Sequence, residues 1–180
     1  EKTRRIAKLP QYLVVQYVRF FWRQDTNKRA KICKPVEFPM KLDLFSFSTP
    51  ELQNTLSVGR KEIVVAEEVA LANRGKAKEE KPASDVVMEE SADSPPFEFE
   101  NDTGFYQLAA VISHQGRDAD GGHYVAWVRY KDDEWLLFDD TTVSFRTTED
   151  VKRLTGHGGA DWHIAYMCIY SSLLKKDLLA

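Results

Sequence analysis

The stretch Gly121–Asp140 constrains the fold of this chain more than any other part of the sequence. Its first half alternates in the manner of a half-buried strand, and it opens on two glycines that allow another backbone to come close. Residues 131–134, Lys-Asp-Asp-Glu, predict a polar turn, after which the chain runs back along the first strand. A hairpin of this length returns Asp139 or Asp140 to the neighbourhood of His123. A carboxylate placed in this way orients the base that serves a nucleophile.

The composition of the chain excludes several classes of protein. With 180 residues it is long enough for one sizeable core, or for one domain that carries an insertion. A net charge of -3 argues against a general nucleic-acid binder, because the phosphate backbone requires a basic face. No apolar run approaches the roughly 20 residues that span a bilayer. We therefore expect neither nucleic acid nor membrane among its partners.

The cysteines and the first residues indicate the setting in which the chain works. Cys33 and Cys168 form no Cys-x-x-Cys pair, which disfavours a disulfide framework and a cysteine-rich zinc site and fits a reducing compartment. Residues 1–5, Glu-Lys-Thr-Arg-Arg, do not resemble a signal peptide, and strand-like sequence follows them at once. We expect a chain cut from within a longer protein.

Most of the remaining ordered sequence predicts strands. Residues 11–22 are rich in β-branched and aromatic side chains and predict one long strand, buried for much of its length. The polar residues 23–34 predict a solvated loop or strand edge, or alternatively a mobile flap beside a binding groove. Further strands are expected over 40–45, 105–114, 143–145 and 162–170, with a short helix from Thr147 or Thr148 to Leu154.

An insertion at about residues 51–104 interrupts the strand pattern. Ser48-Thr49-Pro50 supplies a hydroxyl cap and a proline for the start of a helix over about 50–74, although Gly59 leaves open whether this helix is unbroken. The stretch of about 75–103 is acidic and contains few residues that could join a core. Such a segment buries too little apolar surface to offset its ordering entropy, so we predict that it is disordered.

The four histidines differ in their surroundings. His157 lies among glycines and is most simply a loop residue, whereas His163 follows a tryptophan in a strand and favours a structural role. His114 ends a strand that could neighbour the hairpin, and it is expected to line the same groove without proton chemistry. Only His123 has a carboxylate pair one hairpin away. Their spacings do not suit a metal site, so we predict none.

The base at His123 requires a nucleophile, and the sequence offers no convincing one. Cys168 lies inside an apolar strand and is expected in the core, where cysteine behaves as a small hydrophobe. Cys33 has only nearby lysines to stabilise a thiolate, so a strand or loop role is favoured. No serine lies in a Gly-x-Ser-x-Gly elbow. The residues thus predict a base and its orienting carboxylate only.

Several segments together share their pattern with a known enzyme family. Residues 122–128 and 135–140 (Gly-His-Tyr-Val-Ala-Trp-Val and Trp-Leu-Leu-Phe-Asp-Asp) resemble the histidine box of the ubiquitin-specific proteases, which are papain-like cysteine deubiquitinases. Residues 9–20 and 165–170 are similar to two strands of that family. Within the family, the chain resembles the proteasome-associated member on the segments 49–53, 106–117 and 158–166. The resemblance covers all of the chain except the acidic insertion and the tail.

The resemblance implies an α+β fold. It would be the papain-like ubiquitin-specific protease fold, mainly the antiparallel β-sheet (palm) portion with a few peripheral helices. Residues 1–180 would form the C-terminal part of the catalytic domain. The resemblance also implies that His123 is the general base, that Asp139 holds its imidazole, and that Asp140 assists it or helps to polarise the oxyanion site.

The resemblance further implies a channel for the C-terminal Gly-Gly of ubiquitin. Gly122 and Tyr124 would flank this channel, and its walls would be Phe21, His114 and Tyr166. Two segments match the loops that obstruct the ubiquitin tail in the resting proteasome-associated enzyme: the stretch from Trp22 to Lys34, and the loop of Arg117, Asp118, Ala119, Asp120 and Gly121. The second loop is charged where a serine-rich loop is expected, and its acids could attract the arginines of the ubiquitin tail.

The family's nucleophile lies in an Asn-x-Cys box that this sequence lacks. We therefore expect a nucleophilic cysteine outside the chain, and no hydrolysis of ubiquitin conjugates by these 180 residues alone. The implied partners are ubiquitin, ubiquitinated proteins and the 26S proteasome regulatory particle, in cytoplasm and nucleus, with no cofactor. Two alternatives stay open: a catalytically silent module that binds ubiquitin or docks on the proteasome, and a hydrolase that uses His123 with a serine.

Overall fold

The structure is a computed structural model that describes residues 2–74, 101–117 and 121–178. The chain forms two compact units. The helical unit comprises residues 1–11, 44–105 and 173–180, and the sheet unit comprises residues 12–43 and 106–172. Except for residues 101–103, the stretch predicted to be acidic and disordered lies outside the described residues, as do Asp118, Ala119 and Asp120.

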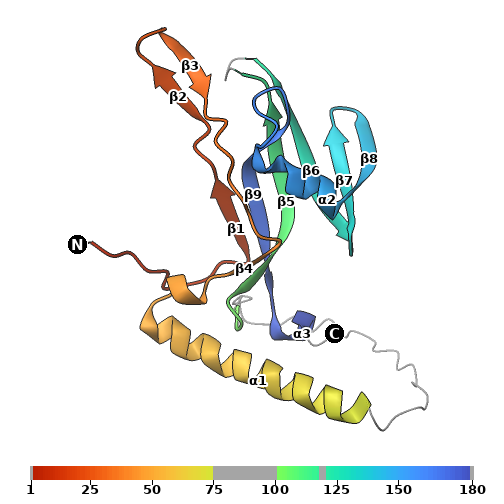
Figure 1. Cartoon of the computed structure of the whole chain (residues 1–180). Coiled ribbons are helices and arrows are strands. Elements are labelled where there is room, and N and C mark those ends of the chain that lie inside the picture. The colour runs from red at the N-terminus through yellow and green to blue at the C-terminus, as the bar shows by residue number, and fades with distance from the viewer. Residues whose placement is uncertain (1, 75–100, 118–120, 179–180) are drawn as a thin grey trace, which may run out of the picture. The chain divides into compact units, whose positions relative to one another are not determined.

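The sheet unit is built on one sheet with the strand order β1-β9-β5-β6-β7-β8, and β4 also pairs with β5 (Figure 1). The pairs β1–β9, β5–β6, β6–β7 and β7–β8 are antiparallel. The strands are β1 (Tyr12–Gln16), β4 (Lys41–Asp43), β5 (Phe105–Gln115), β6 (His123–Lys131), β7 (Glu134–Asp139), β8 (Thr142–Thr147) and β9 (Ile164–Leu173). The strands predicted near these positions are confirmed, and consecutive strands from β5 to β8 lie side by side.

The core of the sheet unit follows from the alternation of side chains along β6 and β7. Val125, Trp127, Trp135 and Leu137 are buried, together with Val151 and Leu154 from the segment after β8. That segment is α2 (Thr148–Lys152) followed by the 3-10 helix η2 (Arg153–Thr155). Thr147 caps α2 in a capping box with Asp150, which confirms the predicted start of this helix.

The prediction of one long strand over residues 11–22 is wrong. β1 ends at Gln16, and β2 (Phe20–Arg23) pairs instead with β3 (Lys28–Lys31) in a separate hairpin. Arg19 explains the break, because its buried guanidinium donates hydrogen bonds to the carbonyls of Ala165 at 3.0 Å and Lys34 at 2.7 Å. The strand is not deeply buried either, since side chains of β1 alternate between exposed and half-buried.

The helical unit contains the 3-10 helix η1 (Phe45–Phe47), α1 (Pro50–Arg74) and α3 (Lys175–Leu178). α1 continues through Gly59, and a Cβ at that position would lie 2.3 Å from the carbonyl oxygen of Asp102. Glycine there allows residue 102 to pack directly on the helix. In the next position, Arg60 lies over the rings of Phe45 and Phe105, at 4.6 and 4.2 Å from their centroids.

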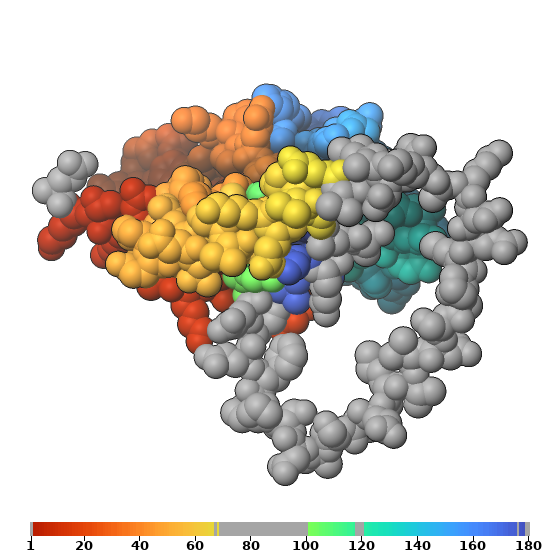
Figure 2. Space-filling model, turned by 90° about the horizontal axis from the view of Figure 1, so that it is seen from below, coloured from red at the N-terminus to blue at the C-terminus, as the bar shows by residue number. Residues whose placement is uncertain are grey.

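The outer surface of α1 runs in orange to yellow across Figure 2. On this helix the side chains of Val58, Val64 and Val65 are each more than half exposed. Among the described residues, no helix is long and apolar enough to cross a membrane.

Candidate active site

The hairpin of β6 and β7 places Asp139 beside His123, as the sequence predicts. Its turn is two residues long, with Asp132 in the left-handed region at φ 44°, and its register sets Ala126 opposite Phe138. At the open end of the hairpin, His123 Nε2 and Asp139 Oδ1 form a hydrogen bond. Both side chains are partly exposed, so an approaching group can reach the imidazole.

The carboxylates around His123 control its proton affinity. The hydrogen bond from Asp139 raises the pKa of His123 above its ordinary value, and the negative charges of Asp139 and Asp140 act in the same direction. Asp140 lies in the turn between β7 and β8 at φ 48°. Among the hydrogen bonds of the described residues, the partner of His123 Nε2 is Asp139, so Asp140 acts on the imidazole through its charge.

The same three side chains also have the spacing of a metal site. The ligand atoms of His123, Asp139 and Asp140 lie within 4.8 Å of one another. An ion bound there would compete for the Nε2 and carboxylate atoms that now share a hydrogen bond. A base with its orienting carboxylate explains the same geometry, so the cluster by itself does not define a metal centre.

Gly122 and His114 pack against each other immediately before the base. A Cβ on residue 122 would lie 2.3 Å from the carbonyl oxygen of Gln115 and 2.5 Å from His114 Nε2, and Gly122 has a φ of 119°. This is the close backbone approach that the two glycines predict. His114 is 1% exposed, and burial, followed by the charge of Lys31, lowers its pKa. His114 is therefore suited to form a wall and unsuited to take up a proton.

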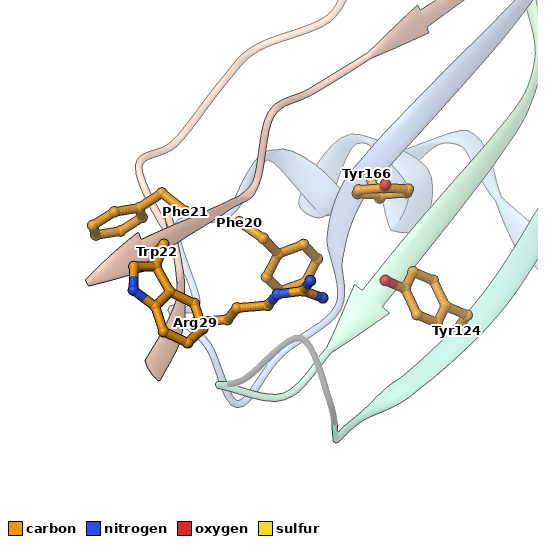
Figure 3. A pocket seen from close by; sticks show the side chains of 6 residues that line it. All are labelled: Phe20, Phe21, Trp22, Arg29, Tyr124 and Tyr166. Atoms are coloured by element: carbon orange, nitrogen blue, oxygen red, sulfur yellow. The ribbon is translucent and has the colours of Figure 1, made fainter. Parts of the chain in front are cut away.

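Aromatic side chains from β2, β6 and β9 surround a cavity of about 440 Å³ (Figure 3). It is lined by Phe20, Phe21, Trp22, Arg29, Tyr124 and Tyr166. The ring of Tyr124 lies 4.5 Å from that of His114 and 5.7 Å from that of Tyr166. The structure thus brings the predicted residues Tyr124, His114 and Tyr166 together on one face of the sheet.

Phe21, predicted as a wall of the channel, lines the cavity together with Phe20, which was not predicted. The ring of Phe20 lies 5.3 Å from that of His114 and 6.1 Å from that of Tyr166. Phe21, on β2, also lines the cavity, and its ring points away from the two tyrosines in Figure 3. Neighbouring residues on a strand point to opposite faces, so both phenylalanines cannot take the same position. Arg29 was also missed, because nothing in its local sequence distinguishes it from the other basic residues of the hairpin.

A second cavity of about 300 Å³ lies beside the base and is lined by Gln115, Gly116, Gly122, His123 and Asp161. Arg117 donates to both carboxylate oxygens of Asp161, at 3.1 and 2.9 Å, and Gln115 Nε2 donates to the Asp161 carbonyl at 2.6 Å. The loop that begins at Arg117 is thereby tied to the segment before β9. Asp161 lies in a segment that carries the family resemblance, but its contact with Arg117 spans 44 positions and could not be predicted from the sequence.

The other predicted gating residues lie apart from this contact. Gly121 is exposed, with open space around its missing Cβ. Trp22 lies on β2 and is 55% exposed, while Lys34 follows β3 and accepts a hydrogen bond from Arg19 at its carbonyl. The hairpin of β2 and β3 thus replaces the loop or strand edge expected over residues 23–34.

Neither thiol of the chain is placed as a nucleophile for His123. Cys168 is fully buried, which confirms its predicted place in the core, and burial raises its pKa to about 11. Its sulfur lies 3.7 Å from the hydroxyl of Tyr17. Cys33 Sγ contacts the carbonyl of Lys31 at 3.8 Å. In the described part of the chain, neither sulfur is hydrogen-bonded to His123.

Solved structures define the class of fold. The SAGA Ubp8/Sgf11/Sus1/Sgf73 DUB module matches with a TM-score of 0.54 at 20% identity, over 94% of this chain and 25% of that one. A structure of this module bound to monoubiquitin, also at 20% identity, gives the same TM-score and coverage. The fold is the α+β, papain-like fold of the ubiquitin-specific proteases, represented here mainly by its antiparallel sheet.

Sequence comparison then assigns the family. The family described as ubiquitin carboxyl-terminal hydrolase matches residues 1–170. Ubiquitin carboxyl-terminal hydrolase 7 of Arabidopsis thaliana is 36% identical, over 94% of this chain and 38% of its own length. Ubiquitin carboxyl-terminal hydrolase 14 of Caenorhabditis elegans is 37% identical, over 98% of this chain and 37% of its own length. The chain belongs to the ubiquitin carboxyl-terminal hydrolase family, and it spans less than half the length of these relatives.

Proposed function

We propose that this chain supplies the base half of the active site of a thiol-dependent ubiquitin hydrolase. His123 acts as the general base, Asp139 orients it, and the nucleophilic cysteine lies in a part of the protein outside this chain. The hydrogen bond between His123 Nε2 and Asp139 carries the proposal. The burial of Cys168 and the raised pKa of its thiol support a nucleophile elsewhere.

The His123–Asp139 hydrogen bond determines which ring nitrogen can act as the base. With Asp139 accepting the Nε2 proton, Nδ1 of the neutral imidazole carries the lone pair. The thiol proton passes to Nδ1, and the thiolate attacks the carbonyl carbon at the C-terminus of ubiquitin. The leaving amine takes the proton from Nδ1 as the acyl thioester forms. Nδ1 then accepts a proton from water, whose oxygen attacks the thioester and releases ubiquitin and the thiolate, which regains a proton.

The electrostatics of the site fit this cycle. The imidazolium forms transiently, and Asp139 stabilises it, as the raised pKa of His123 indicates. Asp140 adds negative charge near the imidazole, while the hydrogen bond of His123 Nε2 is made with Asp139. A thiolate beside such an imidazolium is stabilised in turn, because opposite charges at close range favour the ionised forms.

The aromatic cavity and Gly122 support a channel for the ubiquitin tail. Gly122 lines the cavity beside His123, and its lack of a side chain allows close packing on Gln115 and His114. Tyr124 and Tyr166 form the adjoining wall with Phe20 and His114. The loop tied by the Arg117–Asp161 pair and the hairpin of β2 and β3 are the candidates for elements that obstruct this path at rest.

Two measurements test this function. In the complete protein, His123→Ala should abolish cleavage of a ubiquitin–fluorophore substrate and leave ubiquitin binding largely intact. The 180-residue chain alone should give no turnover. Turnover by the chain after Cys33→Ser and Cys168→Ser would contradict a nucleophile outside the chain, and cleavage by the His123→Ala protein would remove the base assignment.

We further propose that the complete protein works on the 26S proteasome regulatory particle, in cytoplasm and nucleus. The support is the resemblance of residues 49–53, 106–117 and 158–166 to the proteasome-associated member. Affinity-purified 26S proteasomes should retain the complete protein and increase its rate of ubiquitin–fluorophore cleavage. If the protein neither binds proteasomes nor responds to them, this part of the proposal fails and the assignment of His123 is unaffected.

A further inference from the structure

A chain of two hydrogen bonds, one buried and one partly buried, lies next to the proposed base and takes no part in the cycle above. Trp127 Nε1 donates to Ser113 Oγ at 2.9 Å, and Ser113 Oγ lies 3.1 Å from His163 Nδ1. Ser113 is fully buried and Trp127 is 6% exposed. The rings of His163 and His123 meet edge to face, with centroids 6.3 Å apart. Trp127 of β6, Ser113 of β5 and His163, which precedes β9, thus form a path of contacts from the core to His123.

The hydrogen-bonding capacity of each group fixes the tautomer of His163. An indole nitrogen only donates, so Ser113 Oγ must accept the proton of Trp127. The hydroxyl hydrogen of Ser113 then needs an acceptor, because an unpaired buried donor is costly. Among the described residues, His163 Nδ1 is the partner in place to accept it. His163 is therefore neutral, with its proton on Nε2.

The surroundings of His163 favour the same uncharged form. Burial lowers the pKa of His163 most, and the neighbouring His123 lowers it further. Asp139 acts in the opposite direction, while Lys31 and His114 add to the lowering. A charged His163 would also leave the Ser113 hydroxyl without its acceptor.

We propose that His163 is a positioning residue for His123. Ser113 and Trp127 hold the His163 imidazole uncharged and fixed in orientation, and this ring packs against the edge of His123 and keeps it aligned with Asp139. A fixed neutral ring does not repel the imidazolium that forms during the reaction, and it does not compete for the charge of Asp139. This inference rests on the proposed function, because it takes His123 to be the base.

The first test reads the tautomer directly and requires no activity. Nitrogen-15 NMR of the imidazoles in the 180-residue chain at about pH 7 should show His163 neutral, with the proton on Nε2. His157, which lies in a glycine-rich loop, is the internal control for a histidine outside this network. A proton on Nδ1 of His163, or a His163 that is charged near neutral pH, would overturn the proposal.

The second test separates alignment of the base from support of the fold. His163→Asn keeps an acceptor near the Nδ1 position for Ser113 and removes the ring that faces His123. In the complete enzyme we expect kcat to fall about tenfold or more with KM unchanged, while the unfolding midpoint of the chain changes little. The His123 pKa should fall toward its ordinary value, since the imidazole is no longer held against Asp139. His157→Gln is the control and should alter none of these quantities.

The outcomes distinguish this inference from the proposed function. If His163→Asn leaves both kcat and the His123 pKa unchanged, the ring is only structural and the inference is wrong. Should that variant not fold, Ser113→Ala replaces it, because it keeps the ring and removes the hydroxyl that holds it; a kcat equal to that of the unmodified enzyme would again overturn the inference. If instead His123→Ala retains full activity, the proposed function fails, and the NMR result on the tautomer is unaffected.

Discussion

At the scale of single residues, the contrast between Asp139 and Asp140 is the most informative feature of the site. The two carboxylates are adjacent in sequence, but Asp139 ends β7 and bonds to His123, whereas Asp140 lies in the following turn at a positive φ and acts on the imidazole through its charge. Sequence reasoning could place both near the base, because the hairpin length determines where the chain returns. The hairpin length alone could not choose between them, since that choice depends on the backbone of the turn, and the choice of Asp139 came from the family resemblance.

Asp139→Asn should therefore impair the base far more than Asp140→Asn. Without the carboxylate, the His123 pKa should fall to about its ordinary value of 6.5, and kcat/KM of the complete enzyme should fall about 100-fold or more. Asp140→Asn removes only the weaker influence of a nearby charge, so both changes should be smaller. NMR titration of the imidazole and steady-state kinetics measure them. Equal effects of the two variants would contradict the assignment of Asp139 as the orienter.

The same pair predicts how stability depends on pH. The folded-state pKa of His123 is raised, so the pair adds stability that is fully present below the unfolded pKa of about 6.5. This contribution is lost as the pH rises through the folded-state pKa. Urea unfolding of the chain at a series of pH values should show this loss, and Asp139→Asn should remove it. An identical pH dependence in both proteins would show that the pair does not couple to folding.

At the scale of elements, the hairpin of β6 and β7 and the helix α2 were predictable, and the region from β1 to β3 was not. Local signals define the first group, namely the Asp-Asp turn and the capping box of Thr147. The break after Gln16 depends on Arg19, whose partners lie as far as residue 165. A buried arginine looks the same as an exposed one in a sequence. Long-range partners are therefore the information that local pattern reasoning lacks.

Gly122 and Gly121 provide a matched pair of substitutions in one element. Gly122→Ala would force a side chain into 2.3 Å of the Gln115 carbonyl at a φ of 119°. The free energy of unfolding should fall by about 2 kcal/mol or more. Gly121→Ala meets nothing within 4 Å and should leave stability nearly unchanged. Chemical denaturation measures both, and equal stabilities of the two variants would show that residues 114, 115 and 122 are not packed as described.

The tie between Arg117 and Asp161 predicts an effect on substrate binding. The pair is strongly exposed, so Asp161→Asn should leave the free energy of unfolding nearly unchanged. If the loop that begins at Arg117 obstructs the ubiquitin tail, loss of the Arg117–Asp161 ion pair should lower KM of the complete enzyme by about two- to fivefold with kcat unchanged. Glu149→Gln breaks a comparable exposed pair with Lys152 on α2 and is the control. A KM that rises or stays constant would show that the tied loop does not obstruct binding.

At the scale of the whole molecule, the family could be identified from the sequence because several of its motifs lie close together around the proposed catalytic residues. Residues 122–140 contain His123, the carboxylate that bonds to it, and Gly122, which packs closely on Gln115 and His114. Phe20, Arg29 and Asp161 also line the cavities of the site, and only tertiary structure brings them there. The chain also spans less than half the length of its relatives, so the remaining part of an active site can lie beyond it.

The central claim is that this chain holds the base of a thiol-dependent ubiquitin hydrolase while its nucleophile lies elsewhere in the protein. The most direct test is to react the complete protein with a ubiquitin that carries a thiol-reactive group at its C-terminus, and to locate the adduct by mass spectrometry. The account predicts one modified cysteine outside these 180 residues, with modification strongly slowed in His123→Ala. An adduct on Cys33 or Cys168, or no adduct at all, would contradict it.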